Sequence, residues 1–98
     1  MNINKRIENG QGYYALEGRI DTTTAPELER ELKDDMGGIN ALVLDFEHVD
    51  YISSAGLRVL LSAHKAMSKK GGMKVTNVNE MVREVFEVTG FSDILDIA

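Results

Sequence analysis

The sequence predicts a single α/β domain whose mixed β-sheet opens with a hairpin and continues with strands that alternate with helices. Two observations carry this prediction. Short apolar runs typical of strands alternate with longer runs whose apolar residues recur at helical spacing, and glycines separate these segments. The length of 98 residues falls within the usual span of one domain, so residues 1–98 are expected to form one unit. The resulting order, β-β-α-β-α-β-α-β, predicts a sheet that is parallel in its later part, with helices packed against it.

The chain begins with a predicted β-hairpin. Asn2–Ile7 is a polar segment with Ile3 and Ile7 on one face, as expected of an edge strand. Asn9–Gly12 predicts a tight turn, because asparagine and glycine accept the positive φ angles that such turns require. Tyr13–Glu17 then forms the returning strand.

The first helix is predicted to begin near Thr24. Thr24 can cap the helix, Pro26 has no amide hydrogen that needs a partner, and Glu27 can complete a capping box. The glycine pair 37–38 ends the helix. One helical face carries its apolar residues, which are Ala25, Leu28, Leu32 and Met36.

Strands and helices alternate in the rest of the chain. Ala41–Phe46 is a nearly continuous apolar run and predicts a strand buried on both faces. Ser54–Lys70 predicts the second helix, Met73–Val78 a strand, Glu80–Val88 the third helix and Ile94–Ile97 a short last strand. The residues expected to face inward are Leu57, Leu60, Leu61, His64 and Met67 in the second helix, and Met81, Val82, Val85 and Phe86 in the third.

The composition excludes several classes of function. The chain has 16 acidic and 11 basic residues, a formal charge of −5, and its only dense basic run is Lys65–Lys70. A nucleic-acid binder normally shows a basic excess, so we expect no nucleic-acid partner. The absence of cysteine excludes disulfides and thiolate sites and fits a reducing compartment. No apolar run approaches the roughly 18 residues of a membrane span, and Met1–Asn4 is not typical of a signal peptide. We therefore expect a soluble cytoplasmic protein with no membrane partner.

The most informative segment is Asp50–Leu57, which opens the second predicted helix. Ser53 and Ser54 have a structural explanation, because serine is a favoured N-cap that stabilises a helix by about 1 kcal/mol. Gly56 favours a functional one, because a glycine in the first turn leaves the amides of residues 55–57 open to an approaching group. Helix N-termini accept anions, phosphate included. The pattern therefore permits a phosphorylated serine without requiring one.

Five segments, taken together, resemble the STAS domain of the anti-sigma-factor antagonist type. Each segment alone is moderately specific, but their order and spacing are strongly so, and the resemblance extends over essentially the whole chain. The segments are Leu16–Asp21, Ala25–Leu28, Leu42–Phe46, Val49–Leu60 and Val82–Phe91.

The resemblance implies a partner switch. In this family the unphosphorylated antagonist binds an anti-sigma factor that is also a serine kinase, and so releases the sigma factor. The kinase uses ATP to phosphorylate the antagonist and break the complex, and a metal-dependent serine phosphatase restores it. The motif places the phosphoacceptor at Ser54, with Ser53, which stands where many relatives have aspartate, as a minor alternative. The residues implied at the partner interface are Asp21, Thr22, Thr23, Thr24, Ser53, Ser54, Ala55, Gly56 and Leu57. Many relatives continue beyond the position of Ala98 into a final helix, so we expect one sheet face to be less covered, or to be covered by a partner.

Other functions fit the sequence less well. Ser54 with His48 or His64 and Asp45 or Asp50 supplies the residue types of a catalytic triad, but no Gly-x-Ser-x-Gly elbow surrounds the serine, so we expect no enzyme. The acidic residues lack calcium-loop spacing and the glycine pairs match no nucleotide fingerprint, so no metal or cofactor is expected, and ATP belongs to the kinase. The main alternative is a stand-alone STAS domain that regulates a sensory assembly, a secretion system or a transporter complex.

Overall fold

The computed structural model describes all of residues 1–98, and the elements follow the predicted order. In chain order they are β1 (Asn2–Glu8), β2 (Gln11–Ile20), α1 (Ala25–Met36), β3 (Ala41–Ile52), α2 (Ser54–Met67), β4 (Met73–Thr76), α3 (Glu80–Thr89), the short 3₁₀ helix η1 (Phe91–Asp93) and β5 (Asp96–Ile97). β2 and β3 are longer than predicted, because backbone pairing continues through residues 18–20 and 47–52, where glycine and polar residues interrupt the apolar pattern.

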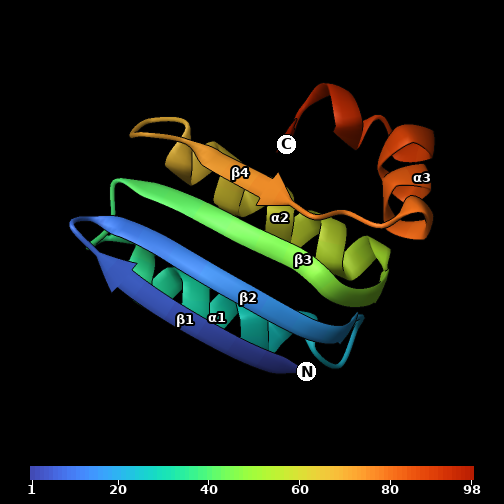
Figure 1. The fold of residues 1–98 in the computed structure, drawn as a ribbon, viewed down its shortest axis with the longest axis horizontal. Coiled ribbons are helices and arrows are strands. Elements are labelled where there is room, and N and C mark those ends of the chain that lie inside the picture. The colour runs from blue at the N-terminus through green and yellow to red at the C-terminus, as the bar shows by residue number, and fades with distance from the viewer.

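The five strands form one sheet in the order β1-β2-β3-β4-β5, antiparallel between β1 and β2 and parallel elsewhere, as predicted. Asn9 and Gly10, both at positive φ, form the hairpin turn, and β2 resumes pairing at Gln11. Figure 1 shows α1 and α2 against one face of the sheet and α3 beyond the end of β4. The opposite face carries no helix.

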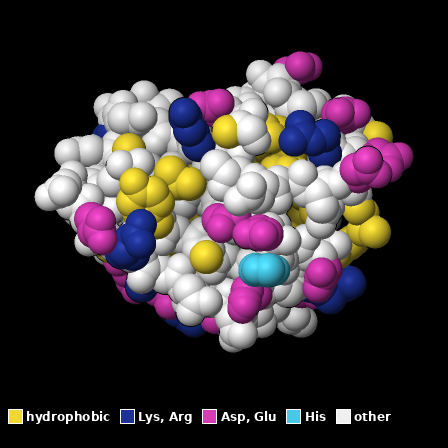
Figure 2. All heavy atoms as spheres, in the orientation of Figure 1, with side chains coloured by type: hydrophobic (Ala, Val, Ile, Leu, Met, Phe, Trp, Pro, Cys, Tyr) yellow, Lys and Arg dark blue, Asp and Glu magenta, His cyan; other side chains and the backbone are white.

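β3 is buried on one face only, which corrects the prediction of a strand covered on both sides. Leu42, Leu44 and Phe46 point toward the helices and are fully buried. Ala41 and Val43 lie on the open face and are half-buried. Successive side chains of a strand point to opposite faces, and helices cover only one of them. Figure 2 shows the open face, where apolar side chains form small patches between charged groups.

The second half of β3 is irregular. Within residues 45–48, and again within 49–51, β3 carries one residue more than β2 between paired positions. The Asp45 carboxylate supports the first of these bulges, because its Oδ1 accepts hydrogen bonds from the Glu47 amide and the Asn77 side chain, each at 3.0 Å.

A core of 22 buried residues lies between the sheet and the helices. Phe46 of β3 contacts Phe86 of α3, with ring centroids 6.1 Å apart. From α3 only Val82 and Phe86 are buried, and Met81, which was predicted to face inward, is 61% exposed. α3 contacts the rest of the protein through a narrow face that carries Val82 and Phe86. Met81 is one residue away from Val82, so its side chain points about 100° away from that of Val82.

The apolar faces of the first two helices follow the prediction more closely. Ala25, Leu28 and Leu32 of α1 and Leu57, Leu60 and Met67 of α2 are buried, while Met36, Leu61 and His64 lie half-buried at the edges of these faces. None of the helices has the length and apolar character needed to cross a membrane.

Polar contacts hold the C-terminal part of α1 in place. At the C-terminal end, the Lys70 ammonium donates to the carbonyl oxygens of Met36 and, at 3.0 Å, Ile39. Along the helix, the hydroxyl of the buried Tyr14 donates to the Asp35 carboxylate. Burial, with this carboxylate, raises the pKa of Tyr14, so its hydroxyl stays protonated and remains a donor.

Candidate functional site

The loop Asp21–Thr24 and the segment Ser53–Leu57 lie next to each other at the carboxyl ends of β2 and β3. Ile20 and Ile52 are the last paired residues of the two strands, and the Ser53 amide donates to the Ile20 carbonyl oxygen at 2.8 Å. Both segments lie at the right-hand end of Figure 1, where α1 and α2 begin. The parallel pairing therefore places side by side the two segments that the resemblance assigns to one interface.

Asp21 organises the loop before α1. Its Oδ1 accepts hydrogen bonds from the amides of Thr23 at 3.0 Å and Thr24 at 3.2 Å, and from the Thr23 hydroxyl at 2.7 Å. Its carbonyl oxygen accepts from the Ala25 amide at 2.8 Å. Thr24 makes no side-chain capping bond, and its hydroxyl donates instead to the Arg19 carbonyl oxygen at 2.7 Å. Thr24 therefore stands at the N-cap position, as predicted, but the prediction that its side chain caps the helix is wrong. The Asp21 carboxylate instead holds the turn that precedes α1.

The Asp21 carboxylate is ionised and fixed in place. Hydrogen bonds from the Thr23 hydroxyl and amide lower the pKa of Asp21 to about 2. Arg19 Nε lies 3.5 Å from the other carboxylate oxygen, and the same guanidinium stacks over the Tyr51 ring at 4.3 Å. Sequence reasoning missed Arg19 and Tyr51 because they meet only through the register of β2 and β3, which shifts immediately before this pair.

The two serines differ in exposure. Ser54 is the first residue of α2; it is exposed, and its hydroxyl makes no hydrogen bond within the protein. Ser53 occupies the N-cap position with extended backbone, but its Oγ is buried and has no hydrogen-bond partner. Neither side chain caps α2, so the geometry does not support capping as the reason for the serine pair. The group presented to solvent is the Ser54 hydroxyl.

Gly56 allows α2 to begin close against the ends of the strands. A Cβ at this position would lie 2.7 Å from the Ile20 and Ile52 side chains and 3.1 Å from the Ile20 carbonyl oxygen. The Leu57 amide already donates to the Ser53 carbonyl oxygen at 2.9 Å. The prediction that this amide is open to a ligand is therefore wrong. The role of Gly56 is close packing of helix against sheet, which fixes the position of Ser54.

Only part of the implied interface is accessible. Thr22, Thr23 and Ser54 are exposed, Asp21, Thr24, Ser53 and Ala55 are half-buried, and Gly56 and Leu57 are buried. The Leu57 side chain therefore belongs to the core and is not available to a partner. The first turn of α2 contains no acidic side chain, so the positive end of the helix dipole is not neutralised by the helix itself.

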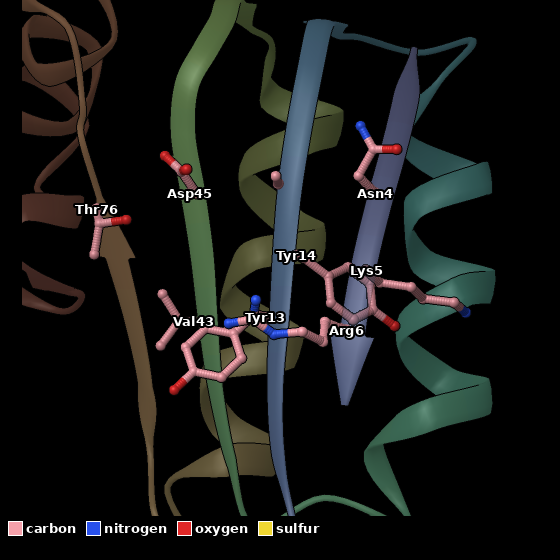
Figure 3. Close-up of a pocket in the computed structure, with 9 residues that line it drawn as sticks. Asn4, Lys5, Arg6, Tyr13, Tyr14, Val43, Asp45 and Thr76 are labelled. Carbon is pink, nitrogen blue, oxygen red and sulfur yellow. The ribbon is translucent and has the colours of Figure 1, made fainter. Parts of the chain in front are cut away.

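The other candidate chemistries receive no support from the geometry. Neither His48 nor His64 bonds to the Ser54 hydroxyl, and the Nδ1 atom of His64 is buried without a partner. No three His, Asp or Glu side chains lie close enough together to hold a metal ion. The largest hollow, about 470 Å³, lies on the open sheet face, where the Arg6 guanidinium stacks over the Tyr13 ring at 4.8 Å (Figure 3). None of its lining residues belongs to the site around Ser54.

Comparison with known proteins identifies the family. Residues 2–98 match the STAS domain. The anti-sigma-B factor antagonist of Bacillus subtilis is 32% identical over 101 residues, which cover 100% of this chain and 93% of that protein. The putative anti-sigma factor antagonist BtrV of Bordetella bronchiseptica is 40% identical over 85 residues, or 85% of this chain and 73% of that protein. The crystal structure of an anti-sigma factor antagonist from Mycobacterium paratuberculosis matches with a TM-score of 0.88 and 25% identity, and the match covers 98% of this chain and 83% of that one. The chain therefore belongs to the STAS domain family, together with bacterial anti-sigma-factor antagonists.

Proposed function

We propose that this protein is an anti-sigma-factor antagonist that binds a serine-kinase anti-sigma factor while unphosphorylated and is released when Ser54 is phosphorylated. One observation carries the proposal. Ser54 stands exposed at the N-terminus of α2 with an unbonded hydroxyl, on a segment that is tied to β2 through Ser53 and Ile20. A kinase can reach this hydroxyl without unfolding the site. The names of the relatives point to the same role.

Burial distinguishes the two candidate acceptors. The Oγ atom of Ser53 is inaccessible, whereas Ser54 is exposed. Transfer of a phosphoryl group to Ser53 would require its side chain to rotate outward or the start of α2 to move away from the sheet. The close contact of Gly56 with Ile20 and Ile52 opposes such a movement. Ser54 is therefore the acceptor in the proposed mechanism.

Phosphorylation of Ser54 would change charge locally while the fold stays the same. A phosphoserine carries about −1.5 to −2 charges near neutral pH. At a helix N-terminus this charge is favourable by roughly 0.3–1 kcal/mol, so the modified protein remains folded. The same charge must be desolvated when a partner covers Ser54. A hundredfold loss of affinity needs only about 2.8 kcal/mol, which such desolvation readily supplies.

In the proposed mechanism, three proteins share the phosphorylation chemistry. This chain supplies the hydroxyl and the binding surface and performs no catalysis of its own. The kinase supplies ATP and its magnesium, and a metal-dependent serine phosphatase removes the phosphate and restores binding. Binding of the unphosphorylated form occupies the kinase and releases its sigma factor, in the cytoplasm where the transcription machinery works.

Mass spectrometry after a kinase reaction tests the acceptor. The purified protein is incubated with ATP, magnesium and a purified serine-kinase anti-sigma factor from the same organism. We expect one phosphate, on Ser54, in the wild type and in Ser53→Ala, and none in Ser54→Ala. Phosphate on Ser53, or none at all together with no binding to the kinase, would contradict the proposal.

Calorimetric titration of the kinase tests the switch. Ser54→Ala should bind about as tightly as the wild type, because it adds no charge at the covered position and breaks no hydrogen bond that holds the site in shape. Ser54→Asp should bind at least tenfold more weakly, because it places a charge at the covered position. Circular dichroism spectra of all three proteins should superimpose, and a change of fold in Ser54→Asp would argue against a local mechanism.

A further inference from the structure

α3 carries an apolar stripe that nothing in the protein covers. Three of the four exposed large apolar side chains lie in the C-terminal part of the chain: Met81 is 61% exposed, Val88 81% and Ile94 44%. Met81 and Val88 stand two turns apart on the outer side of α3, and the half-buried Val85 lies between them. These three residues, called here the α3 stripe, line an open hollow of about 310 Å³ together with Glu84 and Thr89.

One border of the α3 stripe is acidic. At 100° per residue, Glu84, Glu80 and Glu87 follow one another around the helix next to Met81 and Val88. Figure 2 shows apolar, acidic and basic side chains close together at the end of the molecule where α3 lies, and Arg83 follows Glu87 around the helix, farther from the stripe than the three acids. A surface that matches the stripe therefore offers an aliphatic side chain flanked by lysine or arginine.

The α3 stripe is at the same end of the molecule as Ser54. The Asn79 side chain, which caps α3 through the Val82 amide at 2.9 Å, also donates to the carbonyl oxygen of Val49 in β3 at 2.8 Å. α3 thus starts against the second half of β3, shortly before that strand leads into Ser53 and Ser54. In Figure 1, α3, the start of α2 and the start of α1 share the right-hand end of the sheet. A protein docked on Ser54 therefore has α3 within its reach.

We propose that the α3 stripe is a second contact for the partner that binds around Ser54, a serine-kinase anti-sigma factor whose surface there carries an aliphatic side chain bordered by basic residues. This inference rests on the proposed function and extends it to a second element. The α3 stripe supplies apolar burial, its acidic border supplies orientation, and the segment around Ser54 supplies the part of the contact that phosphorylation controls.

The test compares substitutions of the α3 stripe with matched controls elsewhere. The double variant Met81→Gln/Val88→Gln keeps helix-compatible side chains but removes the apolar surface. Ile7→Gln changes the remaining exposed large apolar residue, 46% exposed on β1, and serves as the control. Calorimetric titration with the purified kinase should show at least tenfold weaker binding for the double variant and a change below twofold for Ile7→Gln. The melting temperature of the double variant should match that of the wild type.

A second pair of variants tests the acidic border. Glu84→Gln should weaken binding to the kinase several-fold at low salt. The effect should be much smaller at 1 M salt, where the Debye length is about 3 Å and exposed charges are screened from each other. Asp34→Asn, an exposed acid on α1, removes the same charge elsewhere and should leave binding unchanged at both salt concentrations.

The outcomes separate this inference from the proposed function. If Ser54→Asp loses binding while Met81→Gln/Val88→Gln binds like the wild type, the α3 stripe is not part of the contact and the inference is wrong, whereas the proposed function stands. A wild-type dimer in sedimentation that the double variant abolishes, with kinase binding unaffected, would assign the stripe to a second copy and also overturn it. Absence of kinase binding by the wild type refutes the proposed function, and the inference falls with it.

Discussion

Substitution of Gly56 by alanine tests whether close packing sets the position of the candidate phosphoacceptor. The added Cβ would lie 2.7 Å from side-chain carbons of both Ile20 and Ile52 and 3.1 Å from the Ile20 carbonyl oxygen. The two side chains belong to fully or nearly fully buried residues and cannot swing into solvent. The start of α2 must therefore move outward by several tenths of an ångström, and Ser54 moves with it.

Opposing effects determine the size of the change. Overpacking a well-packed site costs about 1–3 kcal/mol. Alanine recovers up to about 1 kcal/mol of helix propensity relative to glycine, and less in the first turn. The net expectation is a loss of about 1–2 kcal/mol in the free energy of unfolding. For a domain of this length, each kcal/mol lowers the melting temperature by roughly 4–8 °C.

Thermal unfolding followed by circular dichroism measures this loss, with Gly37→Ala as the control. Gly37 has helical backbone angles at the end of α1, and a Cβ there would meet nothing within 4 Å. Gly37→Ala should be neutral or stabilising by about 0.4–1 kcal/mol. If Gly56→Ala proves as stable as the wild type and is phosphorylated at the same rate, packing does not position Ser54 and the reasoning is refuted.

Other substitutions test the polar contacts of the fold. Asp21→Ala should lower the melting temperature at pH 7. Because folding lowers the pKa of Asp21 to about 2, the ionised carboxylate contributes its full stabilisation above the unfolded pKa of about 3.9. In paired melting curves, the difference from the wild type should therefore shrink as the pH falls from 4 to 2. Tyr14→Phe removes the hydroxyl that bonds Asp35, and urea titration should show a loss of about 1–3 kcal/mol, whereas a loss below 0.5 kcal/mol would contradict the contact. Lys70→Met should speed amide hydrogen exchange in residues 36–40, which the Lys70 contacts hold, while Lys69→Met, at an exposed neighbour, should not.

The order of elements could be predicted because the signals are local. Leu28 and Leu32 lie one turn apart, and any helix that packs on a sheet needs such a pair. The open sheet face could not be predicted from the apolar run 41–46, which looks the same whether one face or both are covered; the expectation of a less covered face came only from the family resemblance. Coverage depends on strand order. Right-handed connections between β2, β3 and β4, which advance in one direction across the sheet, place α1 and α2 on the same face.

The site shows the same division between local and non-local signals. Ser54 could be assigned to a helix start, because its position follows from the sequence around it. The turn held by Asp21 was within reach of sequence reasoning, since an aspartate side chain commonly accepts a hydrogen bond from the backbone amide two residues further on. The exposure of Met81 could not be predicted, because it depends on how α3 is rotated against Phe46 and its neighbours, which only the packed structure defines.

The two proposed contacts lead to one further prediction, which concerns how their contributions to the binding free energy combine. Phosphorylation of Ser54 adds charge beside the start of α2, whereas the α3 stripe and its acidic border keep their charge and exposure. If the contacts contribute independently, Met81→Gln/Val88→Gln should weaken binding by the same factor in the wild type and in Ser54→Asp, so that the losses add in free energy. A phosphorylated antagonist would then retain the α3 part of its affinity and dissociate only because the contact at Ser54 is lost. A double variant that weakens the wild type but leaves Ser54→Asp unchanged would show instead that the partner reaches α3 only after it has closed over Ser54.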